Sequence, residues 1–160
     1  MPKVTVAGHP VHPQLIVAPG ALLPFSLVMD AMYLSTGEET YADAAYYTMV
    51  GGFVGGLAAA AAGAADYLEI PNRSRSKRIA NIHALLNVTM LGAYGLNLLL
   101  RRGRRPRTGT VPVLLSVAGS LGVLTSSWYG GHLVYEHGLR VKGSSPLEGA
   151  PEAKLPGDKK

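Results

Sequence analysis

The chain has no cysteine among its 160 residues. This absence excludes disulfide bonds, iron–sulfur clusters held by thiolates and the covalent attachment of c-type haem. A thiol nucleophile is excluded as well, and no serine lies in the G-x-S-x-G motif of a nucleophile elbow. The sequence therefore gives no support for hydrolytic or nucleophilic catalysis. Whether the protein is an enzyme stays open, and a stand-alone enzyme is the less favoured interpretation.

Charge is also scarce, because only 16% of the residues are Asp, Glu, Lys or Arg. Four long runs contain almost none of them: residues 15–34, 41–65, 79–100 and 111–134. Each run reaches the length of about 20 residues that crosses a bilayer. A soluble bundle would show a polar stripe on every helix, and the run GGFVGGLAAAAAGAA has none. The sequence predicts an all-α, four-helix transmembrane bundle with up-down-up-down topology in a lipid bilayer.

The two ends of the chain differ from this hydrophobic part. The N-terminus lacks the short apolar stretch and small-residue cleavage site of a signal peptide, so we expect the first run to be retained. Residues 143–160 are rich in Pro, Gly, Ser and charge, and are expected to form a disordered polar tail. Residues 1–142 then form one transmembrane domain. No internal repeat is evident in the sequence.

The net charge of +5 comes from basic residues next to the ends of the runs. This position suits lipid head groups and topology better than nucleic acid, for which no role is expected. The face shared by the two termini carries the larger number of basic residues: Lys3, Arg73, Arg75, Lys77, Arg78, Arg140 and Lys142, against Arg101, Arg102, Arg104, Arg105 and Arg107. The excess predicts a multi-pass protein of the cytoplasmic membrane with both termini in the cytoplasm.

Two patterns describe how the spans pack. The second span repeats small residues at four-residue spacing, which allows helices to approach closely. Pro19 and Pro24 fall inside the first span and are expected to kink it. His83, Asn87 and a second polar pair, Tyr94 and Asn97, return to one face of the third span, so this stripe is expected to point into the bundle.

The five histidines all fall at the same membrane face if the four runs cross alternately. His9 and His12 open the first span, His83 begins the third, and His132 and His137 end the fourth. Asp66 ends the second span at the same level. Histidine at membrane depth is costly and usually faces a partner, a cavity or a bound group. The position of these side chains therefore indicates a site.

In a bundle with short loops, the first and third spans lie diagonally across the core. His12 and His83 are then expected to face each other, and Asp66 to face the end of the fourth span. Two imidazoles in this position are suitable axial ligands for a b-type haem. A divalent metal ion bound by His9, His12, Asp66 and His83 is an alternative, and proton transfer is another.

His132 and His137 lie five residues apart, about 140° around a helix, and are not expected to point at one centre. His137 is preferred as a third cofactor ligand, and His132 is expected at the membrane interface. Asn87 and Tyr135 are expected to hydrogen-bond the ligands. Asp30 lies near the opposite membrane face, where we expect it to reach water.

The segments GHPVHPQLIVAPGALL, DYLEIP, RIANIHALLN and GGHLVYEHGLRV resemble, in this order, the bacterial predicted membrane protein family called domain of unknown function 2231. The resemblance covers residues 8 to about 142 and implies four membrane helices with an unassigned role. The motif residues it carries over are His9, His12, Asp66, His83, Asn87, Tyr135 and His137. Some relatives carry a fused Rieske-type iron–sulfur domain, which this chain lacks, so an electron partner would be a separate protein or a quinone.

Two functions follow as hypotheses. The first is electron transfer by haem b, or a metal ion, bound through His12, His83 and His137. The second is a structural or accessory membrane subunit without a cofactor, in a homo- or hetero-oligomer, whose histidines serve packing and interface roles.

Overall fold

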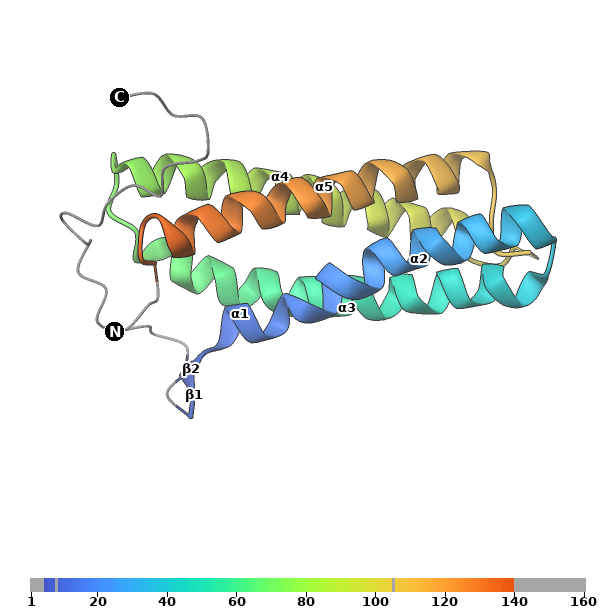
Figure 1. The fold of residues 1–160 in the computed structure, drawn as a ribbon, viewed down its shortest axis with the longest axis horizontal. Helices are drawn as coiled ribbons and strands as arrows, with labels where there is room; N and C mark the ends of the chain where they lie inside the picture. The colour runs from blue at the N-terminus through green and yellow to red at the C-terminus, as the bar shows by residue number, and fades with distance from the viewer. Residues whose placement is uncertain (1–4, 8, 105, 140–160) are drawn as a thin grey trace, which may run out of the picture.

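The structure, a computed structural model, describes residues 5–7, 9–104 and 106–139. A short antiparallel pair, β1 (Thr5–Val6) and β2 (His9–Pro10), precedes the helices α1 (Val11–Leu15), α2 (Val17–Thr36), α3 (Glu39–Leu68), α4 (Arg75–Arg101) and α5 (Thr110–Tyr135). The helices form four long spans, of which α1 and α2 share the first. Figure 1 shows these spans side by side, with successive spans running in opposite directions. The predicted tail, residues 143–160, lies outside the described residues, as do Lys3, Arg105, Arg140 and Lys142.

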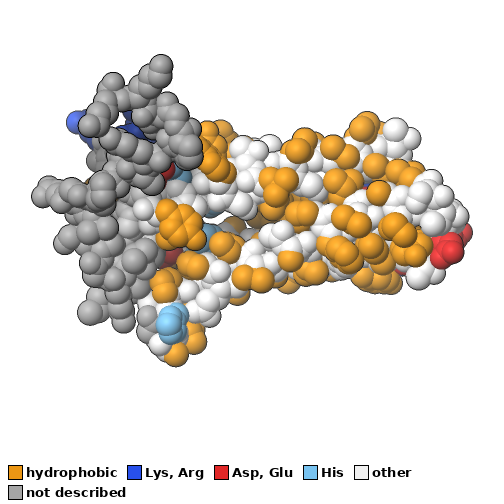
Figure 2. Space-filling view, in the orientation of Figure 1, with side chains coloured by type: hydrophobic (Ala, Val, Ile, Leu, Met, Phe, Trp, Pro, Cys, Tyr) orange, Lys and Arg blue, Asp and Glu red, His pale blue; other side chains and the backbone are white. Residues whose placement is uncertain are grey.

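The four-helix transmembrane bundle is confirmed. All four spans are long and apolar enough to cross a membrane. Large apolar side chains cover their outer surfaces, for example Leu85 at 68% exposure and Leu124 at 63%. Figure 2 shows these side chains along the length of the bundle, with acidic side chains gathered at one end. An apolar surface of this extent is unfavourable in water and suits the hydrocarbon of a bilayer.

The helices pack as a four-membered ring. Helix α2 packs mainly against α3 and α5, and α4 packs against the same two helices, so α2 and α4 lie diagonally. The core between them contains Leu23, Met49, Met90, Tyr94 and Val123. This layout matters because it allows side chains of the first and third spans to meet across the centre.

The first span is divided at Ile16, between α1 and α2. Pro19 explains the position of the break, since its nitrogen has no hydrogen for the carbonyl of Leu15 and its ring crowds that carbonyl. Helix α2 continues through the second proline, Pro24, as one helix.

The glycines of α3 allow α2 to approach closely. A Cβ atom placed on Gly52 would lie 2.7 Å from the side chain of Leu23, and one on Gly55 would lie 2.7 Å from Cβ of Ala18. Neither contact is possible for a larger residue without movement of the helices. The packing role predicted for these glycines is therefore confirmed.

The buried positions reveal a two-fold repeat that the sequence did not show. Asp30 and Arg101 are 71 residues apart, and the buried pairs Leu23/Tyr94 and Ser26/Asn97 have the same separation. Buried positions of α3 and α5 correspond likewise, as in Gly52/Gly119, Gly56/Val123, Ala59/Ser126 and Asp66/Leu133. The two helical hairpins thus share a burial register, as in parallel membrane repeats. The sequence alone shows no repeat, because the paired side chains differ chemically although their buried positions correspond.

Candidate functional site

His12 is fixed by a backbone carbonyl of the neighbouring helix. Its Nδ1 lies 2.8 Å from the carbonyl oxygen of Ala59. A carbonyl oxygen only accepts, so Nδ1 carries the proton and Nε2 of the neutral ring keeps a free electron pair. The ring fits there because Gly63 follows one turn later: a Cβ on Gly63 would lie 2.9 Å from Cε1 of His12. A glycine therefore makes room for the imidazole.

His83 repeats this arrangement in the second hairpin. Its Nδ1 lies 2.9 Å from the carbonyl oxygen of Ser126 on α5. A Cβ on Gly130, again one turn later, would lie 3.0 Å from Cε1 of His83. The same tautomer follows, with the proton on Nδ1. Each hairpin thus presents one imidazole whose Nδ1 is held by a carbonyl and whose Nε2 is an electron-pair donor.

The two imidazoles lie against each other across the bundle. Their ring centroids are 6.4 Å apart and the ring planes are nearly perpendicular, at 87°. The two imidazoles are therefore direct neighbours, one from each hairpin.

Asn87 and Ser126 complete the surroundings of His83. The Asn87 amide lies 3.1 Å from Nε2 of His83, 2.8 Å from its backbone oxygen and 2.8 Å from the hydroxyl of Ser126. The amide has two hydrogens for three acceptors, and the contact to Nε2 of His83 is the longest of the three. For His12, no hydrogen bond to Nε2 is present within the described residues, so the two halves of the site differ here.

His132 and His137 form a second pair, with centroids 5.5 Å apart. The sequence predicted that these rings do not point at one centre; they nevertheless lie side by side, because α5 ends at Tyr135 and His137 follows in a turn. Nδ1 of His132 lies 2.8 Å from Glu136, and its ring stacks on Trp128. The structure therefore groups His137 with His132.

The remaining predicted site residues differ in exposure. His9 is exposed in β2, and Tyr135 is 88% exposed at the end of α5. Asp66 is buried at the end of α3. Within residues 5–7, 9–104 and 106–139, no group of three His, Asp or Glu side chains is placed to hold a metal ion. The proposed set of His9, His12, Asp66 and His83 is therefore not gathered around one point.

At the opposite end of the bundle, the structure contains a charged pair that the sequence interpretation missed. Arg101 binds Asp30 through two hydrogen bonds of 2.6 and 2.7 Å, and both side chains are 0% exposed. The prediction that Asp30 reaches water was wrong, as was the assignment of Arg101 to the head groups. His12 and Asp30 are 18 residues apart, and so are His83 and Arg101. Five turns of α4 place His83 and Arg101 on one face, which meets His12 of α1 near one end of the bundle and Asp30 of α2 near the other.

Every N–H group of the Arg101 guanidinium donates a hydrogen bond. Nε of Arg101 donates to Asn97, and the guanidinium also donates to the hydroxyl of Ser116 and the backbone oxygen of Arg107. The Asn97 amide in turn donates to Ser116 and to the carbonyl of Pro112. The polar stripe predicted on the third span thus continues one turn further, to Arg101. Because the polar groups around Arg101 are hydrogen-bonded to one another, they form a structural network and not a ligand-binding site.

These features define a class: a helical membrane bundle built from two similar hairpins, with an imidazole pair near one end and a buried ion pair near the other. The chain belongs to the family described as predicted membrane protein (DUF2231), which it matches over residues 8–143. Comparison with curated proteins and with solved structures finds no match.

Proposed function

We propose that His12 and His83 are the axial ligands of a b-type haem and that the protein carries electrons in the membrane. The observation that supports this most is the fixed tautomer of both rings, each with Nδ1 on a carbonyl oxygen. Ligand histidines commonly donate their second nitrogen to a carbonyl or carboxylate, which orients the ring and strengthens the ligand. A haem iron needs only two protein ligands, which is the number that the site offers.

The chain's own groups would then have separate tasks. The bound haem would supply one-electron chemistry. Ala59 and Ser126 hold the two rings through their carbonyl oxygens, and Gly63 and Gly130 leave the space for them. Asn87 would release Nε2 of His83 and keep its hydrogen bonds to the His83 backbone oxygen and to Ser126. A separate redox protein or a quinone would exchange the electron.

The experiment is an absorption spectrum of the detergent-purified protein from haem-replete cells, with haem and protein quantified. The proposal predicts about one haem per chain, a Soret band and sharp bands in the dithionite-reduced sample. A colourless protein that also fails to take up added haem would contradict it. Such a result would favour the accessory subunit without a cofactor.

The glycines give a sharper prediction. Gly63→Ala should weaken haem binding by about 10- to 100-fold, because the new Cβ displaces His12 from its carbonyl, a loss that has this effect at other ligand histidines. Gly92→Ala is the matched control, since a Cβ at Gly92 has no neighbour within 4 Å. The control should keep its haem and gain slightly in thermal stability, as alanine favours a helix. Equal haem affinity in the two variants, measured by haem titration, would contradict the assigned role of Gly63.

A further inference from the structure

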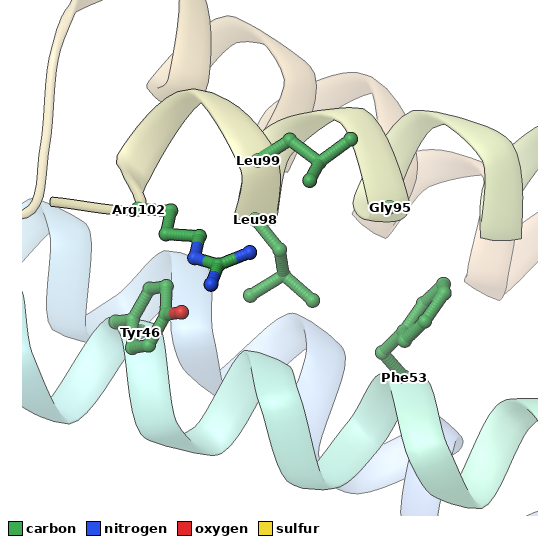
Figure 3. Close-up of a pocket in the computed structure, with 6 residues that line it drawn as sticks. All are labelled: Tyr46, Phe53, Gly95, Leu98, Leu99 and Arg102. Atoms are coloured by element: carbon green, nitrogen blue, oxygen red, sulfur yellow. The ribbon is translucent and has the colours of Figure 1, made fainter.

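A groove lies between α3 and α4 at the end of the bundle far from the His12–His83 pair. Its volume is about 420 Å³, and its lining combines apolar side chains with one cation: Tyr46, Phe53, Gly95, Leu98, Leu99 and Arg102. Figure 3 shows Arg102 and Tyr46 together at one end of the groove and Phe53 toward the other. Leu99 is 66% exposed, so the groove opens to the surface that the bilayer covers.

The apolar part of the groove suits a hydrocarbon chain. Gly95 forms its floor, where a Cβ would lie 3.4 Å from the ring of Phe53. Phe53 and Leu98 also pack against the core, so the groove has a well-packed apolar wall. A chain lying here would run parallel to the helices and would cover the face of Gly95.

The polar end of the groove is the guanidinium of Arg102. Arg101 is buried on Asp30, but the next residue, Arg102, is exposed and follows the last turn of α4. No ion pair involves Arg102 within the described residues. The nearby Asp43 is already paired with Arg107, 3.0 Å away. The guanidinium is thus available to an anion at the level where a membrane helix reaches the head groups.

Tyr46 is placed to assist. Its ring packs beneath the guanidinium of Arg107, 4.8 Å from the ring centroid, and beside Tyr47. Tyrosine is enriched at the level of the lipid head groups, where its hydroxyl donates to lipid oxygens. An apolar groove between helices, with an arginine and a tyrosine at one end, is complementary to a lipid that combines a hydrocarbon chain with a negatively charged head group.

We propose that this groove binds one anionic phospholipid, with the phosphate on Arg102 and Tyr46 and an acyl chain along Leu98, Gly95 and Phe53. The proposal does not depend on the haem. Guanidinium groups bind phosphate through paired hydrogen bonds. Zwitterionic lipids carry the same phosphate, but their cationic head group offsets its charge, so a site with one arginine favours lipids of net negative charge. The lipid would fill the space between α3 and α4.

Native mass spectrometry of the detergent-purified full chain, titrated with phosphatidylglycerol or phosphatidylcholine, tests this proposal. The wild type should bind the anionic lipid about fivefold more tightly, the gain expected from one arginine near the lipid charge. Arg102→Gln should remove this preference, whereas Arg104→Gln, an exposed control in the same loop, should keep it. Gly95→Leu should reduce binding of both lipids, and Gly92→Leu, one turn earlier on an open face, should not.

Two outcomes would overturn the proposal. If Arg102→Gln keeps the preference, the phosphate is bound elsewhere. If Arg104→Gln loses it equally, the lipid responds to the general positive charge of this end. Circular dichroism shows whether each variant retains its helices, so a misfolded variant is recognised. The haem content of the same samples is independent of these results.

Discussion

Asp30→Ala should lower the free energy of unfolding by about 3–5 kcal/mol, which is the usual cost of removing one partner of a buried ion pair. The Arg101 guanidinium would keep its hydrogen bonds to Asn97 and Ser116 but would carry a buried charge without a counter-charge. Its remaining hydrogen-bond partners are the Asn97 amide, the Ser116 hydroxyl and the Arg107 backbone oxygen, none of which carries a negative charge. Arg101→Ala should lower the free energy of unfolding by a similar amount, because Asp30 would then carry a buried charge without a counter-charge.

Asp43→Ala is the matched control. Asp43 forms a 3.0 Å ion pair with Arg107, but its side chain is 37% exposed, and exposed pairs contribute about 1 kcal/mol or less. Asp30→Leu combined with Arg101→Leu should be more stable than either single alanine variant, because no unpaired charge remains. The measurement is reversible unfolding in mixed detergent micelles. Equal losses for Asp30→Ala and Asp43→Ala would show that the Asp30–Arg101 pair is not buried.

His12→Ala and His83→Ala should each weaken haem binding by more than about 100-fold, since removal of a ligand costs at least as much as removal of its supporting hydrogen bond. The reduced spectrum of any haem that remains should change to that of iron with one protein ligand. Alanine favours a helix, so both variants should keep their helices. The test is haem titration with absorption spectroscopy.

His132→Ala is the control for these two variants. His132 is bound to Glu136 and stacked on Trp128, so its loss should leave the haem site intact. His137→Ala distinguishes the present assignment from the three-ligand hypothesis, and it should also keep the haem. If only His137→Ala lost the haem, the assignment of His12 and His83 would be wrong.

The sequence predicted the general fold well, because run length and charge scarcity alone define membrane spans. It also predicted that His12 and His83 face each other, since short loops place the first and third spans on a diagonal. It could not predict that the rings of the second histidine pair, His132 and His137, lie close together. The helical angle between His132 and His137 was calculated as if α5 continued, whereas it ends at Tyr135.

The ion pair was missed for a different physical reason. Counting charges assigns each arginine at the end of a span to the head groups, but it ignores the rotation of the helix. Arg101 lies on the same face of α4 as His83, five turns away, and the 18-residue spacing recurs between His12 and Asp30 in the first span. A search for equal spacing of polar residues in the first and third spans would have found both pairs and the repeat.

The most direct test of the central claim is cross-linking of the first span to the third in a chain that has no native cysteine. His12→Cys combined with His83→Cys, treated in native membranes with a short bifunctional thiol reagent, should give an intramolecular cross-link. The pair His12→Cys and His132→Cys serves as the comparison and should react much less. Efficient cross-linking of the comparison pair, with none between positions 12 and 83, would contradict the paired-imidazole site.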